Sequence, residues 1–243
     1  MAVRTNQGQV FKLGLRSGVE RGVRKIATKR KERRLSVAEI QRLGGAIRAA
    51  EQGQWERPVA LAAVKLLLLT GFRISEGQGL QRAWLNSDQS YVRFPDTKSD
   101  GQVRAIGSSA VKLITSQPAR KNCPYVFPAD VGDGHYTAAK GCLVRLCHAA
   151  KIEGVTPHTL RHTFGSVAGD LGFSELTIAA LLGHAARGVT QGYVHIDEAL
   201  KLAASRTCDE IAGHLSINRC GVTSTEAKSV ISIDFTADSS SLC

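Results

Sequence analysis

The sequence predicts a mainly α-helical fold with one small antiparallel β-sheet, an α+β domain. Several segments carry apolar residues at helical spacing behind a residue that favours a helix start. A single stretch, residues 90–109, instead carries β-branched and aromatic residues on both sides of the turn sequence KSDG. With 243 residues, 43% of them hydrophobic, the chain is large enough for one domain with a substantial core.

Basic residues are concentrated at the N-terminus. Residues 1–36 contain 11 Lys and Arg against 2 Asp and Glu, so they hold +9 of the net charge of +11 and leave +2 for the rest. Such a charge run is typical of a solvated arm, and equally of an arm that contacts nucleic acid or a membrane surface. We therefore expect residues 1–34 to form a basic arm or linker.

The first two predicted helices have clear boundaries. Ser36, with Glu39 three residues later, predicts a capping box, and an apolar stripe follows at helical spacing. The second helix covers residues 58–69 and ends near Gly71, because glycine favours the left-handed residue that closes a helix.

The middle of the chain is predicted to contain both helices and a β-hairpin. Residues 76–86 predict a third, short helix, and the hairpin over residues 90–109 follows it. Two further helical patterns cover residues 111–116 and 136–150.

The last third of the chain is helical up to a polar tail. Thr156 followed by Pro157 predicts the start of a helix that runs to about residue 171. Ser174 caps the next helix, and residues 197–215 form a further amphipathic one. Residues 216–243 are rich in Ser and Thr without a clear period, so we expect a disordered tail.

Cysteine spacing and hydropathy indicate the cellular compartment of the protein. The six cysteines include no C-x-x-C pair and match no zinc-site spacing. The N-terminus lacks the apolar segment of a secretory signal, and the longest apolar run, residues 59–70, is interrupted by Lys65 and too short to span a bilayer. We expect a cytoplasmic protein with free thiols and no membrane partner.

The helix predicted after Thr156 gathers cationic side chains on one face. His158, Arg161 and His162 are three and four residues apart. A guanidinium grips two phosphate oxygens, and an imidazole moves protons near neutral pH. Histidines four residues apart also fit a metal site, but the acidic residue of H-E-x-x-H is missing and the arginine repels a cation, so no metal is expected.

Tyr193 alone is typical of a half-buried core tyrosine. A phenol, whose ordinary pKa is about 10, is a poor nucleophile at neutral pH unless cations stabilise the phenolate. A tyrosine that follows so many arginines and histidines favours attack on a phosphodiester, which leaves a phosphotyrosine link.

Four ordered motifs resemble those of the tyrosine recombinase (phage integrase) family. LLLLTGFRISEGQGLQRAWLN resembles the first arginine box, and TKSDGQVRAI resembles the hairpin lysine motif. HTLRHTF resembles the H-x-L-R-H box, and LLGHAARGVTQGYVHI resembles the L-G-H box with the tyrosine motif behind it. The resemblance covers roughly residues 30–210 and implies that residues 35–215 form the family's catalytic domain.

The resemblance also implies site residues. Arg73 and Arg161 are expected to hold the non-bridging oxygens of the scissile phosphate. Lys98 is expected to protonate the departing 5′-oxygen, His158 to take up the tyrosine proton, and His184 to hydrogen-bond a phosphate oxygen.

By the same resemblance Tyr193 is the nucleophile, and Glu76 and His162 support the site. Each residue also has an ordinary structural interpretation when it is taken alone. Lys98 fits a solvated turn, and His184 fits a helix end, where a histidine is favourable. The six catalytic types in the family's order favour the functional interpretation.

The implied function is DNA strand cleavage and rejoining through a 3′-phosphotyrosine intermediate, as in site-specific recombination or integration. The implied partners are double-stranded DNA and further copies of the chain, as a dimer or tetramer on DNA. No cofactor is expected, since the phosphotyrosine keeps the energy of the phosphodiester. Family members usually carry a helical core-binding domain before the catalytic domain, so the resemblance implies that residues 1–34 are a linker or a remnant of that domain. Two alternatives therefore stay open: a non-recombining DNA-binding remnant and a topoisomerase I-like relaxing enzyme.

Overall fold

The computed structural model describes residues 33–95, 102–184 and 198–216. The chain divides into two units, Met1–Glu32 and Arg33–Cys243, and every described residue belongs to the second. The predictions for residues 1–32, for Lys98 and Tyr193, and for residues 217–243 fall outside the described residues. Ser216, the first residue of the predicted tail, is the last residue of a helix that covers Glu198–Ser216.

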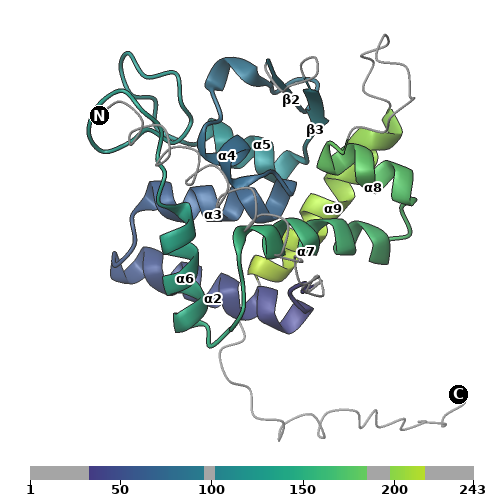
Figure 1. Ribbon diagram of the computed structural model, residues 1–243, viewed down its shortest axis with the longest axis horizontal. Coiled ribbons are helices and arrows are strands. Elements are labelled where there is room, and N and C mark those ends of the chain that lie inside the picture. Colours follow the sequence, from purple (N-terminus) through teal and green to yellow (C-terminus); the bar gives the residue numbers. More distant parts are fainter. Residues whose placement is uncertain (1–32, 96–101, 185–197, 217–243) are drawn as a thin grey trace, which may run out of the picture. The chain divides into compact units, whose positions relative to one another are not determined.

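The described part is helical with a three-stranded antiparallel sheet of order β1-β2-β3, which confirms the predicted fold class (Figure 1). Its helices are α2 (Val37–Gly53), α3 (Pro58–Thr70), α4 (Ile74–Gln78), α5 (Ser108–Thr115), α6 (Ala139–Ala149), α7 (Pro157–Asp170), α8 (Glu175–Leu182) and α9 (Glu198–Ser216). Its strands are β1 (Leu85–Asn86), β2 (Tyr91–Phe94) and β3 (Gln102–Ala105).

Three helix starts follow the predicted capping chemistry. The Ser36 hydroxyl accepts the Glu39 backbone N–H at 3.2 Å, and the Glu39 carboxylate accepts the Ser36 N–H at 2.9 Å. The Thr156 hydroxyl opens α7, and the Ser174 hydroxyl accepts a backbone N–H in the first turn of α8. Each contact satisfies an amide that a helix start otherwise leaves without a partner, so local sequence sets these boundaries.

Helix α3 is the centre of the core. All its residues from Ala60 to Thr70 are buried except the half-buried Lys65. It contacts α2, α4, α5, α6, α7 and α9 (Figure 1). This burial explains the apolar sequence of α3. Among the described residues, no helix is long and apolar enough to cross a bilayer.

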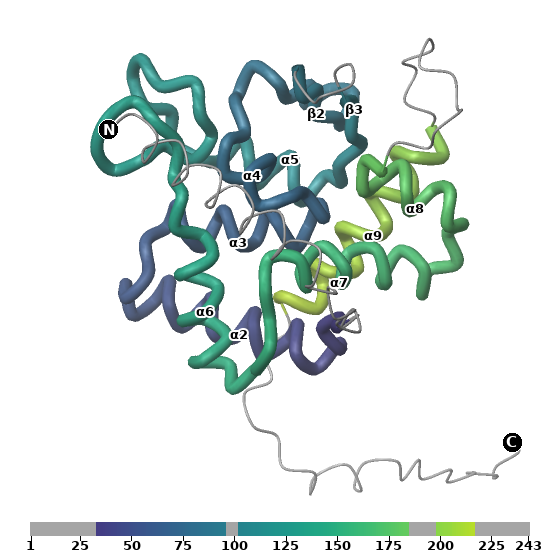
Figure 2. Tube along the Cα trace, in the orientation of Figure 1, coloured from purple at the N-terminus to yellow at the C-terminus, as the bar shows by residue number. Residues whose placement is uncertain are grey.

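The first and last described helices lie side by side, as the tube in Figure 2 shows. A Cβ added at Gly44 of α2 would lie 2.1 Å from the Leu215 carbonyl oxygen of α9. Only a residue without a side chain permits this approach, which brings α9 onto α2 and buries Cys208 and Ile211 in the same core.

The predicted helix over residues 76–86 is wrong. Helix α4 ends at Gln78, a 3₁₀ turn covers Arg82–Trp84, and Leu85–Asn86 pair with β2 as strand β1. Gly77 and Gly79 weaken a continuous helix, and the sheet offers the backbone of Leu85–Asn86 a different set of hydrogen bonds.

The hairpin prediction is confirmed in its strands. β2 pairs with β3 antiparallel, with Tyr91 opposite Ala105 and Val92 opposite Arg104. The helix predicted over residues 111–116 begins earlier, at Ser108, and the helix predicted over residues 136–150 runs over Ala139–Ala149.

Candidate active site

Arg73 reaches solvent because of the turn that follows α3. Gly71 ends α3 in the left-handed conformation, with φ at +63°, and a Cβ there would lie 2.8 Å from the Phe164 ring. The next residue, Phe72, is buried in the core. The sequence TGFR thus sends Phe72 inward and Arg73 outward, where its side chain keeps 47% of its exposure.

Glu76 holds Arg73 in place. Its carboxylate accepts the Arg73 backbone N–H at 2.8 Å and the Arg73 Nη1 at 2.7 Å. Burial raises the pKa of the Glu76 carboxyl, but the hydrogen bond from the Arg73 backbone and the charges of Arg104 and Arg73 outweigh burial and bring the pKa below its ordinary value. Glu76 is therefore a carboxylate at neutral pH, with the contacts that a supporting residue needs.

Arg161 is buried, with 5% of its surface exposed, and it joins the ends of two helices. Its Nη1 donates to the Gly71 carbonyl at 2.8 Å, and its Nη2 donates to the Leu182 carbonyl at 2.6 Å. Carbonyls at helix C-termini lack partners within the helix and attract cations. Burial lowers the pKa of Arg161, the charge of Arg73 lowers it further, and Glu76 opposes both.

The two histidines of α7 contact each other. Their Nε2 atoms, from His158 and His162, lie 2.8 Å apart, and the rings meet edge to face with centroids 4.3 Å apart. A hydrogen bond between two ring nitrogens needs one N–H and one lone pair, so at most one of the two rings is charged. His162 thereby orients the imidazole of His158. Among the described residues no group of three His, Cys, Asp or Glu could hold a metal ion.

His184 directly follows the left-handed Gly183 that ends α8, and its backbone N–H donates to the Ala179 carbonyl at 2.9 Å. Burial lowers the pKa of the His184 imidazole below its ordinary value, and neighbouring positive groups lower it further. In order of effect these groups are Arg161, Arg73, Arg104 and, when its ring is protonated, His158. The imidazole is therefore neutral at pH 7 and lies within the field of all four groups.

The structure thus brings five of the site residues predicted from the sequence into one cluster: Arg73, Glu76, His158, Arg161 and His184. His162 joins them through His158. Lys98, which falls between β2 and β3 in the sequence, and Tyr193, which falls between α8 and α9, lie outside the described residues. Their roles stay predictions.

Arg104 was not among the site residues predicted from the sequence. This arginine of β3 is 1% exposed, its Nε donates to the Leu181 carbonyl at 2.8 Å, and its Nη1 lies 3.9 Å from Glu76 Oε2. Burial lowers the pKa of Arg104 to about 10, so the side chain stays charged at neutral pH. The available signal was the hairpin register, because Arg104 stands opposite the fully buried Val92 and opposite residues share a face.

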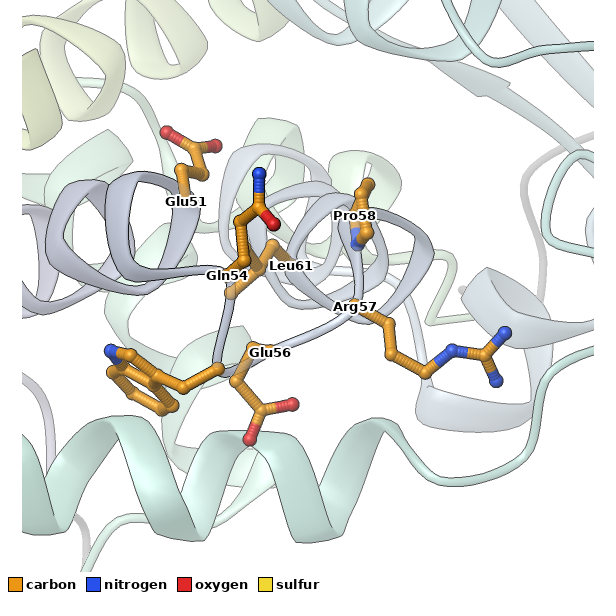
Figure 3. Close-up of a pocket in the computed structure, with 7 residues that line it drawn as sticks. Glu51, Gln54, Glu56, Arg57, Pro58 and Leu61 are labelled. Atoms are coloured by element: carbon orange, nitrogen blue, oxygen red, sulfur yellow. The ribbon is translucent and has the colours of Figure 1, made fainter.

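A pocket lies at the other end of α3 (Figure 3). It has a volume of about 470 Å³, and its lining residues are Glu51, Gln54, Trp55, Glu56, Arg57, Pro58 and Leu61. Figure 3 shows Glu56 turned toward a neighbouring helix, α6, where Arg145 Nη2 donates to Glu56 Oε2 at 3.0 Å. The 13 residues of α3 separate this pocket from the arginine cluster by roughly 20 Å.

Comparison with known proteins agrees with the geometry. Residues 33–199 match the phage integrase family. The chain is 31% identical over 164 residues to tyrosine recombinase XerD of Brucella suis, covering 62% of this chain and 52% of the relative. It is 32% identical over 149 residues to tyrosine recombinase XerC of Agrobacterium fabrum, covering 57% and 46%. The chain spans about half the length of the curated relatives it matches.

Solved structures share the fold at lower identity. The integrase from mycobacterium phage Brujita superposes with a TM-score of 0.58 at 18% identity, over 80% of this chain and 66% of that one. XerA recombinase gives a TM-score of 0.52 at 24% identity, over 76% and 65%. XerH site-specific recombinase bound to its difH substrate gives 0.53 at 18%, over 75% and 56%. At these identities the likeness shows the fold.

Proposed function

The chain belongs to the phage integrase family, and from that premise we propose that it cuts and rejoins DNA strands through a 3′-phosphotyrosine intermediate. The observation that carries the proposal is the cluster of Arg73, Arg161, His158 and His184, in which a neutral imidazole lies in the field of two arginines. Cationic donors fixed around one point suit a phosphate whose charge grows during reaction.

The two arginines bind the phosphate oxygens in this proposal. Arg161 is fixed by two backbone carbonyls, and Arg73 is fixed by Glu76. Because Arg161 is held before DNA arrives, it needs little ordering when the phosphate enters, while Arg73 turns from Glu76 to the phosphate. Neutral His184 donates a hydrogen bond to one phosphate oxygen without adding a charge that the arginines would repel.

Tyr193 is the proposed nucleophile. Its oxygen attacks phosphorus, the bond to the 5′-oxygen breaks, and the tyrosine remains linked to the 3′-phosphate. His158 takes the phenolic proton, and Lys98 gives a proton to the departing 5′-oxygen. Rejoining runs the same steps in reverse, and the phosphotyrosine retains the energy that the new phosphodiester needs.

Double-stranded DNA is the proposed substrate, and further copies of the chain are proposed partners on it. XerH is described in complex with its difH substrate, and the Tn1549 transposon integrase in complex with circular intermediate DNA. A shared fold and the cationic cluster support the same class of substrate for this chain.

A covalent trap tests the proposal. The chain is incubated with a pool of nicked duplexes of random sequence, from which a short 5′-hydroxyl fragment diffuses away after cleavage. We expect a protein–DNA adduct that survives denaturant. Tyr193→Phe removes one hydroxyl, so we expect complete loss of the adduct with DNA binding nearly unchanged. An adduct that persists in Tyr193→Phe assigns the nucleophile to another residue.

A further inference from the structure

Arg104 is a buried cation that the proposed reaction does not use. Its side chain is 1% exposed and stacks over the Phe72 ring, with Cζ 5.3 Å from the ring centroid. Burying a guanidinium is costly unless hydrogen bonds and opposite charges compensate it. The compensation that the described residues provide comes from two places, the end of α8 and Glu76.

At the end of α8, three successive carbonyls accept hydrogen bonds from three side chains. Leu181 accepts from Arg104 Nε at 2.8 Å, and Leu182 accepts from Arg161 Nη2 at 2.6 Å. Gly183 accepts from Gln102 Nε2 at 3.4 Å. These carbonyls end a helix and lack partners within it, so the three side chains fix the turn from which His184 projects.

Gly183 keeps Arg104 against this turn. A Cβ at Gly183 would lie 1.9 Å from Arg104 Nη1 and 2.9 Å from Gln102 Oε1. Glycine is required here twice, because its φ is +64° and because the guanidinium occupies the space that a side chain needs. The close contact with Gly183 therefore couples the position of Arg104 to the turn before His184.

On its other side Arg104 faces Glu76 without closing a hydrogen bond. Nη1 lies 3.9 Å from Glu76 Oε2. Both Nη atoms are buried and have no hydrogen-bond partner among the described residues. Native proteins seldom leave buried donors unpaired, so these two donors require an explanation.

We propose that Arg104 is a positioning residue for the phosphate site, which fixes the turn before His184 through Leu181 and holds Glu76 when Arg73 turns from that carboxylate to the phosphate. The proposal rests on the proposed function, since Arg73 has another acceptor only when a phosphate is bound. Arg104 itself touches no reacting atom, because its Nη groups are buried.

The distances around Glu76 support this exchange of its partner from Arg73 to Arg104. Glu76 Oε1 accepts a hydrogen bond from Arg73 Nη1 at 2.7 Å. When Arg73 moves to a phosphate, Glu76 keeps the Arg73 backbone N–H and needs one further donor for its carboxylate. Nη1 of Arg104 has no hydrogen-bond partner among the described residues and lies 3.9 Å from Glu76 Oε2, so a shift of about 1 Å brings it to hydrogen-bond length.

The first test needs no DNA. The pH titration of the His184 imidazole is followed by NMR in the wild type and in Arg104→Gln, with the resonance assigned through His184→Asn. We expect the His184 titration to move to higher pH in Arg104→Gln, since one nearby positive charge is lost. Arg93→Gln, an exposed arginine of the adjacent strand β2, is the matched control and leaves the titration unchanged. An unchanged titration in folded Arg104→Gln overturns the placement of Arg104.

The second test measures cleavage at saturating DNA, using a duplex selected from the random pool, together with the duplex Kd. We expect Arg104→Gln to lower the single-turnover cleavage rate on the order of 100-fold, as for a small misplacement of reacting groups. Its Kd stays close to the wild-type value. A purely structural role lowers the melting temperature and leaves the cleavage rate of the folded fraction intact, and that result overturns the proposal.

Arg104→Lys covers the case in which Arg104→Gln does not fold. Lysine keeps the charge but has a single head group, which cannot serve Leu181 and Glu76 together. We expect the His184 titration to stay near the wild-type curve while cleavage falls about tenfold. Wild-type cleavage by Arg104→Lys overturns the proposal. Absence of an adduct with the wild type contradicts the proposed function instead, and the titration still decides where Arg104 acts.

Discussion

At the N-terminal end of α3, Glu56 pairs with Arg145, and at its C-terminal end Glu76 pairs with Arg73. The side chain of Glu56 is 3% exposed and that of Glu76 is 12% exposed, so both carboxylates are largely removed from water. The two ends differ in what surrounds these pairs.

The Glu56 end is balanced in charge. The hydrogen bond from Arg145 lowers the pKa of the Glu56 carboxyl, although burial opposes it. Next to it, burial and, after it, the charge of Glu56 raise the pKa of the Cys142 thiol to about 12. The other cations at this end are paired as well, Arg57 with Asp130 and Lys65 with Glu51, so each positive charge here has a carboxylate partner.

The Glu76 end carries an excess of positive charge. The single carboxylate lies among Arg73, Arg104 and Arg161, and each of the three influences or is influenced by it. Stability alone does not favour gathering like charges, so we infer a binding role for this end of α3 and a structural role for the other.

Removing an arginine from each end is the largest expected contrast. Arg161→Ala takes away a fixed donor to the phosphate, so we expect cleavage at saturating DNA to fall about 10²- to 10³-fold. Arg145→Ala is the matched change at the balanced end, where we expect only a lower melting temperature. Cleavage per folded molecule is measured for both variants. Equal losses of cleavage in the two variants would contradict a functional difference between the two ends of α3.

The dependence of folding stability on acid pH gives a second, smaller test of the comparison between the two ends of α3. Glu56 and Glu76 both have a lowered pKa in the folded state, so each stabilises the fold above the ordinary value of 4.5 and loses that effect as pH falls through the lowered pKa. Glu56→Gln is expected to cost about 1 kcal/mol at pH 7, since Arg145 is half-exposed and screened.

The unfolding free energy of Glu56→Gln, measured from pH 7 to pH 3, is therefore expected to fall less steeply than that of the wild type. Its cleavage rate at saturating DNA is expected to match the wild type. A steeper acid loss in Glu56→Gln contradicts the assigned lowering of the Glu56 pKa.

The smallest expected effect concerns the histidine pair. His162→Asn removes the ring that orients His158 but leaves His158 itself, so we expect cleavage to fall by less than about tenfold. His148→Asn, on the exposed surface of α6, is the control and leaves cleavage unchanged. A loss in His162→Asn as large as that of Arg161→Ala assigns His162 a direct role in the reaction.

Local chemistry made much of the fold predictable. Ser36, Thr156 and Ser174 open helices because their hydroxyls accept first-turn amides, and Gly71 closes α3 because it tolerates the left-handed conformation. The predicted short helix over residues 76–86 was wrong because Leu85–Asn86 pair with the next strand, β2, and this sheet pairing overrides the helical pattern there.

The residue types of the candidate site were predictable from the sequence. The residues that position them were less predictable. Arg73, Arg161 and His184 stand in recognisable motifs, and the family resemblance assigned them roles. Arg104 stands in the same motif as Lys98, yet its burial depends on strand register and on an approach to Gly183 from 79 residues away. Such long-range contacts leave no local pattern in a single sequence.

The central claim is that the C-terminal end of α3 binds a phosphate and the N-terminal end does not. Titration with inorganic phosphate at constant pH and ionic strength, followed by NMR, tests it without any knowledge of the DNA target. We expect the His184 ring resonances to shift with a Kd on the order of 1 mM, the shift to be absent in Arg161→Ala, and the Trp55 indole resonance to stay unchanged. Phosphate-dependent shifts at Trp55 with none at His184 would contradict the claim.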